Sequence, residues 1–262
     1  GGPPGEQPGG EERLVDRPGP DSNPRFSPDG RMIAFTSMDG KPDDWIANTN
    51  LCLVPASGGA ITNLSKSFDE NVGTFKWSPD GKTIYFQSTM KTAGHLFALS
   101  VDSKQVRQMT SGEDSYGPFS FSSDFKKTVF LKQNPSTPPD LHIADPTSMT
   151  PTKLTTLNPQ LKDISLATGE VLRWKGTDGM EIEGVLIKPV GYEKGKKYPL
   201  LVNVHGGPAG IHTRNFALDY VYPSHVFAGE GYAVLKSNPR GSGGYGEKFR
   251  KANVRDWGEG DY

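Results

Sequence analysis

The chain has 262 residues, which allows one large domain or two smaller ones, and Gly (32) and Pro (22) make up about a fifth of it, against about 12 % in an average protein. This composition predicts many short strands and turns, hence a soluble and mostly β protein. Lys plus Arg (29) and Asp plus Glu (30) leave a net charge of −1, which argues against a nucleic-acid partner. No apolar run is long enough to span a membrane, and the single Cys52 excludes a disulfide framework and a multi-cysteine zinc site.

Residues 1–22 are expected to form a flexible N-terminal segment. The opening GGPPGEQPGG contains no apolar residue that a core could bury. A removed signal peptide is neither affirmed nor excluded by this start, so the compartment (cytoplasmic or periplasmic) stays open.

A segment then recurs three times between residues 23 and 165. The copies read NPRFSPDGRMIAFTS (23–37), TFKWSPDGKTIYFQS (74–88) and PFSFSSDFKKTVFLK (118–132). An apolar and a hydroxyl residue close the copies at 64–65, 109–110 and 154–155, with a spacing of 45 residues. Periods of about 40–45 residues are typical of four-stranded propeller blades. The sequence therefore predicts a partial β-propeller of about three blades over 23–165.

Ser-Pro-Asp-Gly in the first two copies predicts a tight turn, because Pro restricts φ to a value that suits a turn and Gly accepts a positive φ. The third copy has Phe125 where the others have Gly30 and Gly81, so we expect its turn to differ. Consecutive apolar residues follow each turn, which indicates that neighbouring blades cover both faces of the strand.

The first copy carries an additional polar loop, SMDGKPDDWIANTN. Its Asp43, Asp44 and Trp45 could bind a cationic group, or the loop is merely solvated with one aromatic residue packed beneath it. Three blades do not close a ring. Either further blades precede residue 1 in the natural protein, or this chain is an open fragment.

Residues 166–262 have a different character and predict the N-terminal part of an α/β domain. The expected strands are 171–175, 182–188, 200–204 and 233–237, and the expected helix is 216–229. The strand–helix–strand order of the last three elements predicts a parallel pair of strands.

Two motifs in this region point to chemistry. A strand that leads into His205-Gly206-Gly207-Pro208 can end in backbone N–H groups that form half of an oxyanion hole, although the motif could also be a tight turn. His205 is better interpreted as a hydrogen-bonding residue that shapes this loop than as a metal ligand, because no Cys or acidic cluster accompanies it.

The second motif is NPRGSGGYG at 238–246, whose glycines fit the G-x-G-x-x-G spacing of a dinucleotide-binding turn. That alternative needs a second apolar strand ending in an acidic residue, and the segment EKFRKANVRDWGEGDY contains no such strand. No cofactor is therefore expected.

In their order along the chain, these motifs resemble the prolyl oligopeptidase family of serine peptidases, within it the acylaminoacyl-peptidase and dipeptidyl-peptidase branch. The resemblance rests on FSPDGRMIAF, WSPDGKTIYF, YPLLVNVHGGPAG (198–210), NPRGSGGYG (238–246) and DWGEGDY (256–262). It implies an α/β-hydrolase domain capped by a propeller that limits access to short peptides.

The resemblance also assigns residues. Gly207 would donate its backbone N–H to the oxyanion, and His205, Gly206, Arg240 and Tyr245 would build the wall of the active site, although Arg240 and Tyr245 could equally be structural. No Ser has a Gly two positions before it, so the family's G-x-S-x-G elbow is absent. We therefore expect the Ser/Asp/His triad beyond residue 262, and no turnover by this chain alone.

Two further hypotheses concern partners. The half-built sheet would expose an apolar edge, which a complementary C-terminal chain of the same protein could cover. The alternative function is that of a non-enzymatic propeller that binds partners in a periplasmic complex, but such a module has no reason to carry the stretch from HGGP to DWGEGDY.

Overall fold

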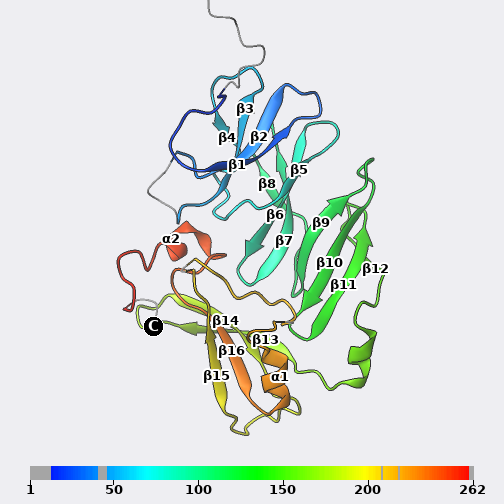
Figure 1. Ribbon diagram of the computed structural model, residues 1–262, viewed down its shortest axis with the longest axis vertical. Coiled ribbons are helices and arrows are strands. Elements are labelled where there is room, and N and C mark those ends of the chain that lie inside the picture. The colour runs from blue at the N-terminus through cyan, green and yellow to red at the C-terminus, as the bar shows by residue number, and fades with distance from the viewer. Residues whose placement is uncertain (1–12, 41–45, 208, 218, 260–262) are drawn as a thin grey trace, which may run out of the picture.

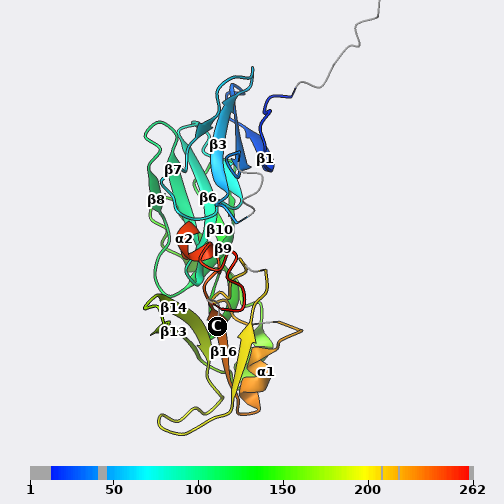
Figure 2. The same cartoon turned by 90° about the vertical axis from the view of Figure 1, so that its left-hand side faces the viewer.

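The computed structural model describes residues 13–40, 46–207, 209–217 and 219–259. Their strands form four sheets of four strands each (Figure 1). The first three sheets are antiparallel, and each follows the order of its strands in the chain. They lie beside one another, and the fourth sheet lies at the opposite end of the molecule (Figures 1 and 2).

The first sheet contains β1 (Asp21–Phe26), β2 (Met32–Ser37), β3 (Asn50–Pro55) and β4 (Thr62–Asn63). The second contains β5 (Phe75–Trp77), β6 (Thr83–Met90), β7 (Ala93–Ser100) and β8 (Val106–Gln108). The third contains β9 (Ser115–Phe121), β10 (Thr128–Asn134), β11 (Thr137–Ala144) and β12 (Thr152–Lys153). A short 3-10 helix, η1 (Pro159–Asp163), follows.

The turn at the start of each repeat has the same geometry in all three sheets. In the first two, the serine hydroxyl donates to the aspartate two residues later (2.6 Å), and Gly30 and Gly81 follow with φ of 75° and 69°. In the third, Ser122 donates to Asp124 at 2.6 Å, and Phe125 adopts φ of 55°. The prediction of a different turn was therefore wrong, because Phe125 takes the left-handed conformation that glycine provides elsewhere.

Packing between the sheets explains how Phe125 is held in that conformation. Its ring stacks on Phe121 with centroids 4.9 Å apart, lies 6.0 Å from the ring of Tyr85 in the second sheet, and is covered by the ammonium of Lys76 at 5.1 Å. These contacts compensate the cost of the left-handed backbone conformation, which is roughly 1–2 kcal/mol for a residue that carries a Cβ.

Both faces of the first sheet carry buried residues, but among the described residues a neighbouring sheet covers only one of them, whereas the consecutive apolar residues predicted a blade on each face. Ala34 is in the main hydrophobic cluster that joins the first and second sheets, together with Phe86 and Phe97. The next residue, Phe35, faces the other side, where it packs with Cys52. The second sheet is less uniform, because β6 alternates between buried and half-buried residues.

Part of the predicted N-terminal segment lies against this outer side of the first sheet. Val15 packs on the cluster around Phe35, and Arg17 donates to the hydroxyl of Ser37 at 2.6 Å. Residues 13–22 are thus tied to the sheet. Residues 1–12 lie outside the described residues, as do Asp43, Asp44 and Trp45 of the polar loop.

The fourth sheet contains β13 (Gly169–Lys175), β14 (Glu181–Ile187), β15 (Leu200–Val204) and β16 (Ala233–Asn238), in the order β13-β14-β16-β15. β15 and β16 are parallel, as predicted, and β13 and β14 form a hairpin that joins β16 in antiparallel fashion. The helix α1 (Ser224–Gly229) packs on one face of this sheet, and α2 (Gly246–Arg250) follows β16 (Figure 2).

The predicted helix over 216–229 is wrong in its first part, because α1 begins only at Ser224. The side chain of Asp219 accepts the backbone N–H groups of Val221 (2.9 Å) and Tyr222 (3.3 Å). Such a local turn competes with helical hydrogen bonding. Pro223 then follows at the helix start, where its missing N–H costs nothing.

Candidate active site

Two loops meet where the parallel strands β15 and β16 end. Their pairing runs from Leu200 opposite Ala233 to Val204 opposite Ser237, so both carboxyl ends reach the same edge of the sheet. In open α/β sheets this edge is where ligands bind. The HGGP loop (residues 205–212) leaves β15, the NPRG loop (residues 238–246) leaves β16, and Gly243 N–H donates to Gly210 O at 3.0 Å.

His205 connects the two loops. Its Nε2 lies 2.8 Å from the hydroxyl oxygen of Ser242, whose hydrogen is donated to Pro239 O at 2.6 Å. Its Nδ1 lies 3.2 Å from Gly206 O. Burial lowers the pKa of His205, which favours the neutral ring. The His205 side chain thus lies between the two loops, within hydrogen-bond distance of both. Among the described residues, no group of three or more His, Cys, Asp or Glu lies close enough together to hold a metal ion.

The far end of the HGGP loop is fixed by Asn238, which is fully buried. Its Oδ1 accepts His212 N–H at 2.7 Å, and its Nδ2 donates to His212 O at 2.9 Å. Burial, with Lys236 and His205 nearby, lowers the pKa of His212 to about 4. The ring is therefore neutral at pH 7, and its Nε2–H donates to Asn203 O at 3.1 Å.

The backbone at Gly207 has a conformation that requires glycine. Its φ is 136°, and a Cβ at this position would lie 2.6 Å from the backbone nitrogen of Gly210. Gly206 and Gly207 are both exposed. Within the part of the chain that the structure describes, the N–H of Gly207 has no hydrogen-bond partner. This donor is free to bind an oxygen atom of a ligand.

Arg240 and Tyr245 leave the NPRG loop toward the β13–β14 hairpin. Arg240 pairs with Asp178 at the hairpin turn, and its side chain is 10% exposed. The hydroxyl of Tyr245 donates to Glu183 of β14 at 3.2 Å and accepts from Asn238 Nδ2 at 3.1 Å. Burial and the charge of Glu183 raise the pKa of Tyr245, so the hydroxyl stays protonated. Both side chains are thus engaged within the fourth sheet and its loops.

Three buried polar residues of this region were missed by the sequence reasoning. They are Glu183, Asn238 and Ser242, all at most 1% exposed. Glu183 interrupts the apolar strand EIEGVLI, and a carboxylate in such a strand is the signal that could have singled it out.

Contacts with the second sheet hold the site against the propeller part. Arg214, which follows the HGGP loop, donates from its backbone to Thr92 O (2.7 Å) and from Nε to Thr92 Oγ1 (2.9 Å). Its Nη1 pairs with Glu113 at 2.9 Å. At the turn between β6 and β7, the N–H of Lys91 donates to Gly244 O at 2.6 Å.

A second contact fixes α2, which lies between the propeller sheets and the fourth sheet (Figures 1 and 2). Glu70 accepts Gly246 N–H at 2.6 Å and pairs with Arg250 at 3.1 Å, and these two charged side chains are 6% and 2% exposed. Burial raises the pKa of Glu70, which Arg250 counteracts. The segment that follows the NPRG loop is therefore anchored on the connection between the first and second sheets.

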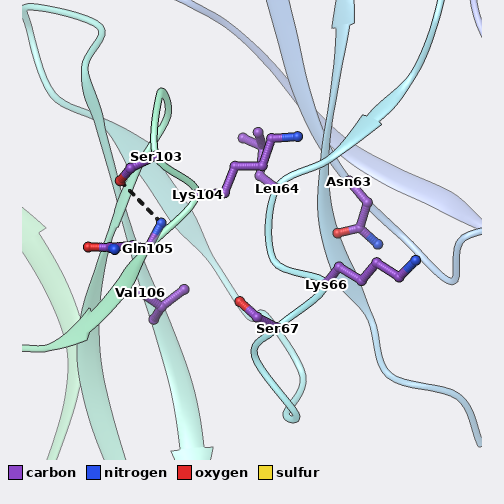
Figure 3. Close-up of a pocket in the computed structure, with 8 residues that line it drawn as sticks. All are labelled: Asn63, Leu64, Lys66, Ser67, Ser103, Lys104, Gln105 and Val106. Atoms are coloured by element: carbon purple, nitrogen blue, oxygen red, sulfur yellow. Dashed lines mark hydrogen bonds between the residues drawn. The ribbon is translucent and has the colours of Figure 1, made fainter.

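A separate pocket lies between the first and second sheets, away from these loops in sequence (Figure 3). It is lined by Asn63, Leu64, Lys66, Ser67, Ser103, Lys104, Gln105 and Val106. None of the predicted site residues lines it. Among the described residues, no helix is long and apolar enough to cross a membrane.

Comparisons with known proteins agree with this architecture. Residues 7–160 match the TolB beta propeller domain, and residues 220–262 match the prolyl oligopeptidase family. Dipeptidyl-peptidase 5 of Porphyromonas gingivalis is 30% identical over 245 residues, which cover 92% of this chain and 34% of that protein. Dipeptidyl-peptidase 5 of Arthroderma otae is 30% identical over 249 residues, which cover 93% and 34% respectively.

Solved structures give the same result. The uncomplexed acylaminoacyl peptidase of Pyrococcus horikoshii aligns with a TM-score of 0.71 and 25% identity over 89% of this chain and 35% of its own. An acylaminoacyl peptidase in complex with Z-Gly-Gly-Phe-chloromethyl ketone aligns with a TM-score of 0.72 and 25% identity.

The chain thus spans about a third of the length of the curated relatives it matches (34%). The predicted fold class, propeller blades followed by the start of an α/β-hydrolase domain, is confirmed by the sheets and by these likenesses. With its propeller repeats, its parallel strand pair and its motifs in this order, the chain carries a TolB beta propeller domain and is similar, over residues 220–262 and in its overall arrangement, to the prolyl oligopeptidase family.

Proposed function

We propose that this chain is part of a serine peptidase that hydrolyses short peptides by acyl transfer, of the dipeptidyl-peptidase or acylaminoacyl-peptidase type. A serine attacks the peptide carbonyl, a base takes its proton, and N–H donors stabilise the negative oxygen of the tetrahedral intermediate. The observation that carries the proposal is the N–H of the exposed residue Gly207, which has no partner among the described residues and lies beyond the carboxyl edge of two parallel strands.

In this proposal Gly207 supplies one of the oxyanion donors, and His205 and Gly206 shape the loop that presents it. Arg240 and Tyr245 build the adjacent wall. Support for these roles comes from the hydrogen bonds that join the HGGP loop to the NPRG loop at both ends. The propeller sheets, anchored through Arg214 and Arg250, limit access to the site.

The nucleophile comes from outside these 262 residues in this proposal. No serine of the sequence has a glycine two positions before it, as the nucleophile elbow requires. The edge strand β15 supports a further part of the proposal, a complementary segment that pairs with it. Leu200, Val202 and Val204 share one face of this strand, where they are 53%, 56% and 66% exposed. A complementary segment that pairs with the edge of β15 can also cover this apolar face.

The experiment compares residues 1–262 with the full-length protein on dipeptidyl and acylaminoacyl nitroanilides. We expect turnover by the full-length protein and none by residues 1–262. Full-length Gly207→Ala keeps the N–H, but its Cβ would lie 2.6 Å from the backbone nitrogen of Gly210 and would displace that donor. We therefore expect a fall in kcat of roughly 100- to 1,000-fold, as for loss of an oxyanion donor. Absence of turnover by a folded full-length protein would contradict the peptidase assignment. An unchanged kcat in Gly207→Ala would contradict the role of its N–H.

A further inference from the structure

Glu183 is a buried carboxylate on β14 at the centre of a hydrogen-bonded chain of side chains. It is 1% exposed. Its Oε1 accepts Arg173 Nε at 2.7 Å and lies 3.7 Å from the ammonium of Lys91, which belongs to the propeller. Its Oε2 accepts the hydroxyl of Tyr245 at 3.2 Å. A buried charge persists only where it is paired and hydrogen-bonded, and both oxygens of Glu183 meet this condition.

The charge of Glu183 sets the direction of the hydrogen bonds that follow. An ionised carboxylate can only accept, so the single hydrogen of the Tyr245 hydroxyl points to Glu183. The hydroxyl oxygen must then accept from the next residue, which is Asn238 through Nδ2 at 3.1 Å. This contact agrees with the amide orientation that the backbone of His212 requires, and it adds a second acceptor for the NH2 group of Asn238.

With the amide oriented in this way, Asn238 holds the backbone of His212 at two points. Nδ2 donates to His212 O (2.9 Å), while Oδ1 accepts His212 N–H (2.7 Å). His212 ends the HGGP loop, and its ring donates to Asn203 O of β15, two residues before the loop begins. Gly207, with φ of 136°, lies between these two fixed ends.

We propose that Glu183 is a positioning residue for the oxyanion donor: through Tyr245 and Asn238 it holds the HGGP loop in the conformation that presents the Gly207 N–H. This inference rests on the proposed function of that N–H. Glu183 does not touch the substrate. Lys91 of the propeller pairs with Glu183, so the position of the propeller relative to the fourth sheet also affects the conformation of the loop.

The kinetic test uses full-length Glu183→Gln and Tyr245→Phe, with Glu170→Gln as the matched control. Glu170 lies on the neighbouring strand β13, where it pairs with Lys188 and is half exposed. A glutamine at 183 can donate to the Tyr245 hydroxyl and thereby competes with Asn238 Nδ2 for the hydroxyl oxygen, which weakens the contact between Tyr245 and Asn238. We expect kcat to fall by about 10- to 100-fold in both variants, because a displaced donor loses transition-state stabilisation, while KM stays within about threefold. The control should keep the wild-type kcat.

A fall in kcat of less than about fivefold in folded Glu183→Gln and Tyr245→Phe would overturn the inference. It would also be overturned if the fall in kcat/KM came from a rise in KM and not from kcat. The double variant Glu183→Gln/Tyr245→Phe adds a second criterion. If Glu183 acts only through Tyr245, breaking the chain of contacts at both residues costs no more than breaking it once. The kcat of the double variant should therefore lie within about threefold of the lower of the two single-variant values. Losses that multiply would overturn the serial chain of contacts.

Amide hydrogen exchange of residues 205–212 in the 262-residue chain separates this inference from the proposed function. We expect exchange of this loop to become at least about tenfold faster in Glu183→Gln and to stay unchanged in Glu170→Gln. If the full-length wild type shows no peptidase activity, the proposed function fails, and hydrogen exchange alone then decides whether Glu183 positions the loop. Faster exchange in Glu183→Gln then supports the positioning of the loop by Glu183, and unchanged exchange overturns it.

Discussion

The buried ion pair between Glu70 and Arg250 offers a direct test of how the propeller part and the α/β part are joined. Replacing Glu70 by Ala leaves the guanidinium of Arg250, 2% exposed, without its charged partner. The same change removes the acceptor of the buried Gly246 N–H, now bound at 2.6 Å. Arg250 keeps Asn71 Oδ1 at 3.1 Å as a neutral acceptor.

Breaking a buried ion pair by removing one partner lowers the free energy of unfolding by about 3–5 kcal/mol. The Gly246 N–H that is left without an acceptor increases this loss, and the remaining hydrogen bond from Arg250 to Asn71 decreases it. We therefore expect Glu70→Ala to lower the free energy of unfolding by about 4 kcal/mol. For a chain of this size that corresponds to a fall in Tm of roughly 8–16 °C.

The assay is urea unfolding followed by tryptophan fluorescence and circular dichroism, with Arg250→Met and the double variant measured beside Glu70→Ala. The double variant should be less destabilised than the sum of the two single variants, because it leaves no unpaired charge. Glu170→Ala, which breaks a half-exposed pair with Lys188, should cost less than about 1 kcal/mol. A loss below about 1 kcal/mol for Glu70→Ala would refute the reasoning.

Three other predictions concern single residues. The pKa of His212 is lowered to about 4 in the folded chain, so the unfolded chain binds a proton more tightly than the folded chain does. The free energy of unfolding should therefore fall as the pH drops from about 6.5 to 4, by about 1–2 kcal/mol because the ring is partly exposed and its charge partly solvated. His212→Gln should remove this part of the pH dependence in urea titrations, and an unchanged profile would contradict it. Ser242→Ala, which deletes a buried hydroxyl bonded to Pro239 and facing His205, should cost about 1–3 kcal/mol in the same assay. Phe125→Gly should be more stable than Phe125→Ala by about 1 kcal/mol, because both lose the ring but only glycine relieves the φ of 55°; equal stability would argue against backbone strain at Phe125.

The parts of the fold that the sequence predicts well are those set by local pattern. The strand 200–204 has the bounds of β15, and the repeats coincide with sheets of four antiparallel strands. The third turn was mispredicted because a tertiary contact, the ring packing of Phe125 between two sheets, outweighs the local preference for glycine. The helix start was misplaced because Asp219 caps a turn that periodicity does not register.

The candidate site follows the same division. The motifs single out His205, Gly206, Gly207, Arg240 and Tyr245, and the structure places all five in the two loops at the end of the parallel strands, while their roles stay a prediction. Contacts between distant parts of the sequence hold this region: Tyr245 bonds Glu183 across 62 positions, and Arg250 of α2 bonds Glu70 across 180. A single sequence holds no signal for such pairings beyond a charged residue in an apolar strand.

We propose that these residues carry the oxyanion loop of a serine peptidase whose nucleophile comes from elsewhere. The most direct measurement is fluorophosphonate labelling of the full-length protein and of residues 1–262, followed by intact-mass analysis and mapping of the modified peptide. We predict one adduct on the full-length protein, at a serine outside residues 1–262, and no adduct on residues 1–262 alone. An adduct on a serine within residues 1–262, or a folded full-length protein that takes up no probe, would contradict the claim.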